Sequence, residues 1–161
     1  MKTLYIMRHG KAEEGFDKAD YKRKLISKGI KRNKKIGGLL KEKKVSFDTI
    51  LCSNAVRTIE TAEYMADLFQ FPKADIQELS NFYLAPVSVM LDTFYTLDNA
   101  LSSVLVVGHN PGISELVTTL SGQLVDWMPT SSLMAIEIDT DKWEEISSAS
   151  TKIAFYLSPK G

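Results

Sequence analysis

The sequence predicts an α/β protein, a three-layer sandwich in which helices flank a mostly parallel central sheet, with one strand near the C-terminus antiparallel. Three observations support this class. Short apolar segments rich in strand formers alternate with segments of helical periodicity over most of the chain. The run Ser103–Val107 is apolar and β-branched, as expected for a strand covered on both faces. Near the end, residues 133–138 and 151–157 are two strand-like segments joined by a connection too short for a long crossover helix, which favours antiparallel pairing.

The other elements follow from local patterns. Residues 3–7 are an apolar run that predicts a buried first strand, and the charged stretch Lys11–Lys24 predicts a loop. Ser27 is expected to cap a helix running to about Lys43, in which Gly37-Gly38 weakens the helix or lets it pack closely. The remaining expected elements are a strand at 47–52, a helix at 55–69, a weaker extended segment at 75–79, a helix after Pro86 and a helix whose apolar stripe covers 113–120. Trp127 and Trp143 are expected to be buried as aromatic side chains, and no function is attached to either.

Length and composition predict one domain over residues 1–161. The chain has 161 residues, 44% of them hydrophobic and 25% charged, which is enough to bury a core without disulfides or metals. Cys52 is the only cysteine and no Cys/His cluster has the spacing of a zinc site, so a reducing cytoplasm is the expected location. The N-terminal apolar run is too short for a signal peptide, and no apolar stretch is long enough to span a bilayer. Association with a membrane is therefore not expected.

The formal net charge of zero hides a local excess of positive charge. Eleven of the 20 Lys and Arg residues fall between Lys22 and Lys44, where Glu42 is the only acid. Such a run is typical of the solvated face of a helix, although it could also attract an acidic phosphoprotein. Without interleaved aromatic residues or a known motif, nucleic-acid binding is not expected.

Three polar clusters follow directly after three predicted strands. They are Arg8-His9-Gly10, the segment 53–58 that contains Arg57, and Gly108-His109-Asn110. The carboxyl ends of strands in an open parallel sheet converge on one crevice, so Arg8, His9, Arg57 and His109 are expected to meet there. Two guanidiniums and two imidazoles suit an oxyanion, and a phosphoryl group is the natural ligand. Gly10 and Gly108 are expected to let the backbone approach that ligand.

Two other chemistries are weaker matches to the same residues. His9 and His109 have no evident Asp or Glu ligand nearby, so we expect no metal and no other cofactor. Cys52 precedes Arg57, as in a thiolate phosphatase loop, but that loop needs five intervening residues and only four are present. Cys52 is therefore interpreted as a core residue.

These residues resemble the histidine phosphatase superfamily. Its Arg-His-Gly signature matches residues 8–10, its Ser-x-x-x-Arg-Thr context matches residues 53–58, and its second histidine matches His109 in Gly-His-Asn-Pro-Gly. The short length, Arg-His-Gly-Lys-Ala and Phe-Tyr-Leu-Ala-Pro at 82–86 are most similar to the SixA branch, the phosphohistidine phosphatases. The likeness runs along nearly the whole chain.

The resemblance implies a two-step mechanism. Neutral His9 attacks phosphorus in line, while Arg8, Arg57 and His109 hold the equatorial oxygens, and water then hydrolyses the phospho-His9 intermediate. This requires an unprotonated attacking nitrogen. We therefore predict that the other ring nitrogen of His9 donates to a backbone carbonyl and fixes the tautomer.

The proton donor and the substrate stay open at this stage. Glu78 is a possible proton donor, but its surroundings do not match the acid-bearing motif of the larger relatives, such as the phosphoglycerate mutases. A leaving imidazole has a reference pKa of about 6.5 and could dispense with a dedicated acid, which favours a phosphohistidine-containing protein as substrate. Lys11 and Arg23 could add positive charge at the rim. The alternatives are a small phosphorylated substrate hydrolysed by the same residues, or a phosphate-binding module without activity.

Overall fold

The computed structural model describes residues 1–159. Strands and helices alternate along the chain as far as residue 121, after which two strands complete the sheet. The strands are β1 (Lys2–Arg8), β2 (Thr49–Ser53), β3 (Gln77–Leu79), β4 (Ser103–Gly108), β5 (Leu133–Ile138) and β6 (Thr151–Leu157). The α-helices are α1 (Ser27–Glu42), α2 (Val56–Leu68), α3 (Val87–Tyr95) and α4 (Gly112–Ser121). Short 3₁₀ turns lie at Asp20–Lys22, Lys73–Asp75, Ser80–Phe82 and Trp143–Glu145.

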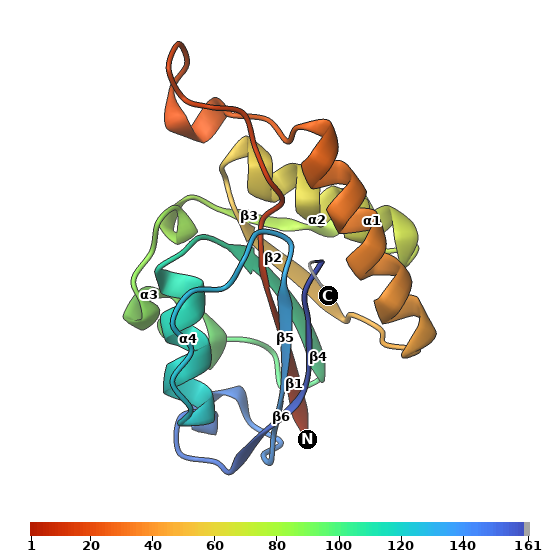
Figure 1. The fold of residues 1–161 in the computed structure, drawn as a ribbon. Coiled ribbons are helices and arrows are strands. Elements are labelled where there is room, and N and C mark those ends of the chain that lie inside the picture. Colours follow the sequence, from red (N-terminus) through yellow and green to blue (C-terminus); the bar gives the residue numbers. More distant parts are fainter. Residues whose placement is uncertain (160–161) are drawn as a thin grey trace.

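The predicted three-layer α/β architecture is confirmed. The sheet order is β3-β2-β4-β1-β5-β6, and β3, β2, β4 and β1 run parallel to one another. Strand β5 runs antiparallel to both β1 and β6, so it is the antiparallel strand expected near the C-terminus. Helices α1 and α2 lie on one side of the sheet and α3 and α4 on the other (Figure 1).

Alternating residues of the central strands pack into two separate hydrophobic cores, one on each face of the sheet. In β1, Leu4 and Ile6 pack in the core shared with α3 and α4, whereas Tyr5 and Met7 pack in the core shared with α1 and α2. Strand β4 is buried from Val104 onward, because helices cover both of its faces. The continuous apolar run in the sequence therefore reflects this two-sided cover.

The boundaries of α1 correct one detail of the expectation. Ile26 is the N-cap, its side chain makes no capping bond, and Ser27 is already helical. Gly37 lies inside the helix where an added Cβ would stand 2.5 Å from Leu68 on α2, whereas a Cβ at Gly38 would meet nothing within 4 Å. Gly37 thus allows close packing of α1 on α2.

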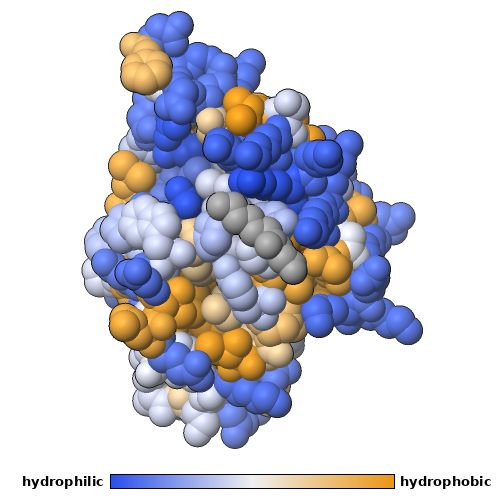
Figure 2. Space-filling view, in the orientation of Figure 1, coloured by the Kyte–Doolittle hydropathy of each residue, from blue (hydrophilic) through white to orange (hydrophobic). Residues whose placement is uncertain are grey.

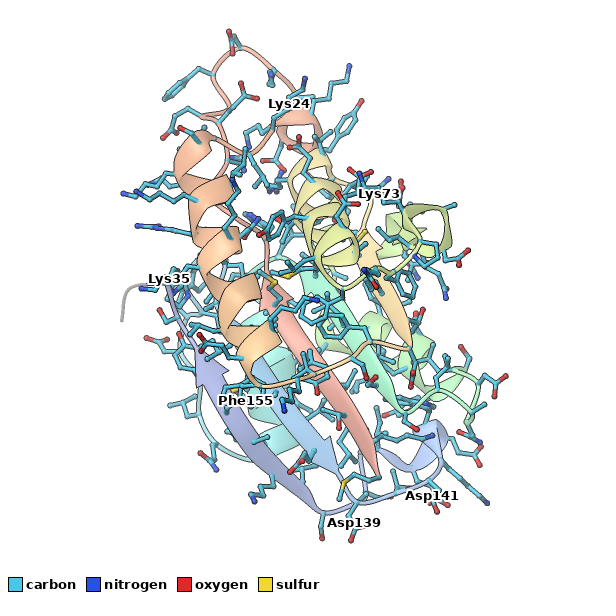
Figure 3. All side chains as sticks on the ribbon, turned by 90° about the vertical axis from the view of Figure 1, so that its right-hand side faces the viewer. Lys24, Lys35, Lys73, Asp139, Asp141 and Phe155 are labelled. Carbon is cyan, nitrogen blue, oxygen red and sulfur yellow. The ribbon has the colours of Figure 1, made fainter. Side chains whose placement is uncertain are left out.

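None of the helices within the described residues has the length and apolar character needed to span a membrane. Figure 3 looks onto α1 and α2, with Lys24, in the long connection that follows β1, at the opposite end of the sheet from Asp139 and Asp141. That connection, residues 9–26, lies beyond the carboxyl end of β1, where the polar clusters follow the strands.

Candidate active site

A pocket of about 450 Å³ lies at the carboxyl ends of the parallel strands. Because β1 and β4 are neighbours and Arg8 pairs with Gly108, the residues after both strands emerge side by side. The ring centroids of His9 and His109 are 5.3 Å apart. The lining consists of Arg8, His9, Lys11, Ala12, Asp20, Arg23, Arg57, Tyr83, Leu84, His109, Asn110 and Thr130. The structure therefore brings together the four residues expected to form the site.

His9 is held as a single neutral tautomer. Its Nδ1 lies 2.7 Å from the carbonyl oxygen of Gly10, and since a carbonyl only accepts, Nδ1 carries the hydrogen. The lone pair is left on Nε2, which accepts a 3.3 Å hydrogen bond from Nε of Arg57. Burial, together with the charges of His109, Arg57 and Arg8, lowers the pKa of His9 to about 3, while the hydrogen bond with Gly10 acts in the opposite direction. The predicted bond from His9 to a backbone carbonyl is confirmed.

His109 is oriented by a chain of buried hydroxyls. Its Nε2 lies 2.6 Å from Oγ of Ser53, whose Oγ is 2.9 Å from Oγ1 of Thr58. Thr58 gives its hydrogen to backbone carbonyls, so Ser53 donates to Thr58 and accepts from Nε2–H of His109. Nδ1 then accepts a 3.2 Å bond from Nη2 of Arg57. Burial first, and then the Arg57 charge, lower the pKa of His109 to about 3.

Arg57 connects both histidines to the connection after β1. It lies in the first turn of α2, with its side chain 3% exposed. Its Nε donates to His9, its Nη1 donates to the backbone oxygen of Asp20 at 2.8 Å, and its Nη2 lies 3.1 Å from Oδ2 of Asp20. Every nitrogen of the guanidinium therefore has a protein partner in this structure.

One guanidinium nitrogen of Arg8 has no hydrogen-bond partner among the described residues. Its Nη1 donates to the backbone oxygen of Met128 at 3.1 Å, and its guanidinium lies 5.7 Å from the ring of Trp127. Its Nε is buried without a hydrogen-bond partner among the described residues. Burial and the neighbouring Arg57 charge lower the pKa of Arg8 from its ordinary value. Trp127 is 58% exposed, so its expected burial is wrong, whereas Trp143 is fully buried.

Two pocket residues were missed by the sequence analysis. Asp20 contacts Arg57 and also pairs with Arg23, whose Nη2 lies 2.9 Å from Oδ1. The hydroxyl of Tyr83 donates to Oδ2 of Asp20. Burial alone would raise the pKa of Asp20, but the bonds from Tyr83 and Arg57 lower it to about 2. Asp20 is one of several acids in a charged loop, and no local pattern distinguishes it.

The glycines beside the histidines serve packing. A Cβ at Gly108 would stand 2.8 Å from the side chain of Ile113, and one at Gly10 would stand 3.0 Å from Nδ2 of Asn33. Gly10 and Gly108 therefore allow α1 and α4 to pack closely, and their expected role in the approach of a ligand stays a prediction. The amide of Gly10 also donates to Oγ1 of Thr61 at 3.0 Å, which fixes the backbone beside His9.

Glu78 does not reach the pocket. It lies in β3 opposite Cys52, is exposed, and is absent from the pocket lining. Cys52 is fully buried in the core beneath α2, and burial raises the pKa of its thiol to about 12. The interpretation of Cys52 as a core residue is confirmed, because such a thiol stays protonated at neutral pH.

The basic residues divide between the pocket and the solvent. Lys11 and Arg23 line the pocket, as expected for rim positions. Along α1, Lys31, Lys34 and Lys35 are exposed, in agreement with a solvated helix face. Figure 2 shows hydrophilic residues dominating the end of the molecule formed by α1 and the connection before it.

Comparisons with known proteins show the family and the fold. The family model of the histidine phosphatase superfamily (branch 1) matches residues 4–85. The structure of the protein histidine phosphatase SixA complexed with tungstate superposes with a TM-score of 0.85 at 25% identity, covering 98% of this chain and 97% of that one. A mycobacterial glucosyl-3-phosphoglycerate phosphatase shares the fold, with a TM-score of 0.65 at 12% identity over 95% of this chain and 97% of that one. The Mycobacterium leprae protein ML1117 is 23% identical over 96% of this chain and its own full length.

Proposed function

The chain belongs to the histidine phosphatase superfamily, and on that basis we propose that it removes the phosphoryl group from a protein phosphohistidine through a covalent phospho-His9 intermediate. The observation that carries the proposal is the tautomer of His9. With Nδ1–H bound to Gly10, the lone pair of Nε2 is directed at Arg57 within the pocket. A low pKa keeps that nitrogen unprotonated at neutral pH, so no deprotonation precedes attack.

In the proposed first step, Nε2 of His9 bonds to phosphorus as the bond to the leaving nitrogen breaks. Arg57 and Arg8 stabilise the charge on the equatorial oxygens. The unpartnered Nε of Arg8 supports this role, because a buried donor without an acceptor is costly and a phosphoryl oxygen would supply one. In the second step, water attacks phospho-His9 and releases phosphate.

The role of His109 depends on its protonation. In the free protein, Nδ1 accepts from Arg57 and Nε2–H is held by Ser53. A phosphoryl dianion near Nδ1 favours protonation of that nitrogen, after which His109 donates to a phosphoryl oxygen. Ser53 keeps Nδ1 turned into the pocket in both states.

The likeness to SixA supports phosphohistidine as the substrate, since that protein is a protein histidine phosphatase and matches along the whole chain. The leaving imidazole has a pKa near neutrality, which suits a pocket that Glu78 does not enter. A location in the cytoplasm is part of this proposal.

The test compares three substrates: a phosphohistidine-bearing protein, an aryl phosphate and a sugar phosphate. Phosphate release is measured for the wild type, His9→Ala and Glu78→Gln. We expect selective turnover of phosphohistidine, lost in His9→Ala and retained in Glu78→Gln. Preferential turnover of the esters would move the substrate to small phosphorylated molecules, and tight phosphate binding without turnover would indicate a binding module.

A further inference from the structure

Asp20 is the only carboxylate among the described residues that line the pocket. It belongs to the 3₁₀ turn Asp20–Lys22, within the long connection between β1 and α1. Its side chain is 46% exposed, whereas His9 is 7% exposed. Asp20 therefore lies toward the mouth of the pocket and His9 toward its floor. In-line attack by His9 places the leaving group on the opposite side of phosphorus, toward the mouth.

Asp20 accepts hydrogen bonds from the guanidinium of Arg57, the same donors that would bind a phosphoryl group. Both Nη atoms of Arg57 are bonded to Asp20, one to the backbone oxygen at 2.8 Å and one to Oδ2 at 3.1 Å. A phosphoryl group that binds Arg57 takes over these donors and releases the carboxylate beside a second negative charge. The charged and titratable groups facing Asp20 are then Arg23, Tyr83, Arg57, His109 and the phosphoryl group itself.

This exchange removes one of the contacts that keep Asp20 ionised. In the free protein, the bonds from Tyr83 and Arg57 outweigh burial and lower the pKa of Asp20 to about 2. Loss of the Arg57 bond and the approach of an anion both favour the protonated carboxyl. Substrate binding thus shifts the equilibrium of Asp20 toward its protonated form at the mouth of the pocket.

We propose that Asp20 is the general acid and base of the phosphatase reaction, an inference that rests on the proposed function. As the His9–phosphorus bond forms and the bond to the leaving atom breaks, the carboxyl proton of Asp20 passes to that atom. The resulting carboxylate then takes a proton from the water that attacks phospho-His9, the nitrogen–phosphorus bond breaks, and phosphate leaves. Asp20 regains its proton and His9 its lone pair, so the cycle is balanced.

The test measures how strongly each variant depends on the leaving group. Asp20→Asn is compared with the wild type on aryl phosphates from p-nitrophenyl to phenyl phosphate and on an alkyl phosphate. We expect turnover of p-nitrophenyl phosphate to change by less than about threefold, and turnover of the alkyl phosphate to fall about 100-fold or more, because only the poor leaving group needs the proton. Asp17→Asn removes the same charge from an exposed position of the same connection and is expected to match the wild type.

A uniform fall of turnover over the whole substrate series would overturn the inference, because a merely structural or gating Asp20 acts on every substrate alike. Asp20→Glu restores the carboxyl and is expected to recover a large part of the turnover of the poor leaving groups. The basic limb of the wild-type pH profile should also disappear in Asp20→Asn. If the wild type hydrolyses neither these esters nor a phosphohistidine-bearing protein, the proposed function fails, whereas His9-dependent turnover with a uniform Asp20→Asn effect rejects the role of Asp20 alone.

Discussion

The free energy of unfolding should fall steeply as the solution is acidified below neutrality. The sequence has only two histidines, and both are buried in the pocket with a pKa lowered from 6.5 to about 3. In the unfolded chain each takes up a proton near pH 6.5, whereas in the native protein neither does so until far lower pH. The native state is therefore favoured above pH 6.5 and loses stability as the pH falls from there toward 3.

The size of the effect follows from this difference in proton uptake. Between pH 7.5 and 5.5, one such histidine lowers the free energy of unfolding by about 1.4 kcal/mol, so the two together lower it by about 2.7 kcal/mol. This is a large share of the 5–15 kcal/mol that stabilises typical domains. Asp20, whose pKa is lowered to about 2 from 3.8, adds a loss of the same sign only at lower pH.

Urea unfolding at closely spaced pH values measures this slope. His9→Gln removes one of the two titrating groups and should halve the slope between pH 7.5 and 5.5. NMR titration of the ring protons should show both histidines neutral at pH 5.5 in the folded wild type. A free energy of unfolding that stays constant over this range would refute the reasoning, as would a histidine that titrates near 6.5 in the native protein.

Three further predictions concern single residues. Ser53→Ala removes the acceptor of His109 Nε2–H and should lower kcat/KM about tenfold, because that donor is left unpaired. Steady-state kinetics with an aryl phosphate would detect this loss. Unchanged kinetics would mean that the hydroxyl does not orient the ring. Cys52→Ala should retain activity within about twofold, and the native thiol should resist alkylation at pH 8, since it is buried and its pKa is about 12; rapid inactivation by an alkylating reagent would contradict this. Gly112→Ala brings a Cβ to 2.2 Å from the backbone oxygen of Ala85 and should lower the free energy of unfolding by at least about 2 kcal/mol, measured by thermal unfolding. The Cβ of Gly38→Ala meets nothing within 4 Å, so this control should be neutral or stabilising. Equal effects of the two changes would show that the backbone at Ala85 moves to make room.

Sequence patterns predicted the fold because each strand and helix carries its own local signal. Apolar periodicity and connection length were enough to predict strands at 133–138 and 151–157 and the parallel direction of the central strands. The meeting of Arg8, His9, Arg57 and His109 in one pocket was predictable for a related reason. Each directly follows or lies within a few residues of a strand end, and the topology of a parallel sheet brings those ends together.

The remaining parts of the site depend on contacts that no local pattern encodes. Asp20 reaches the pocket because the irregular connection after β1 folds back over Arg57, and Tyr83 meets it from a separate turn. The position of Glu78 in the sequence was misleading. It lies in the general stretch where a proton donor was expected, but in the structure it is exposed on the edge strand β3. Trp127 carries no sequence signal for exposure, and its place beside Arg8 depends on the path of the loop before β5.

Direct detection of the covalent intermediate tests the central claim most closely. A phosphohistidine-bearing protein labelled in its phosphoryl group is mixed with excess enzyme, quenched in alkali after milliseconds, and the enzyme is mapped by mass spectrometry. We expect a transient phosphoryl group on His9 Nε2 in the wild type and none in His9→Ala. Turnover without any phosphorylated enzyme residue, or a phosphoryl group on a residue other than His9, would contradict it.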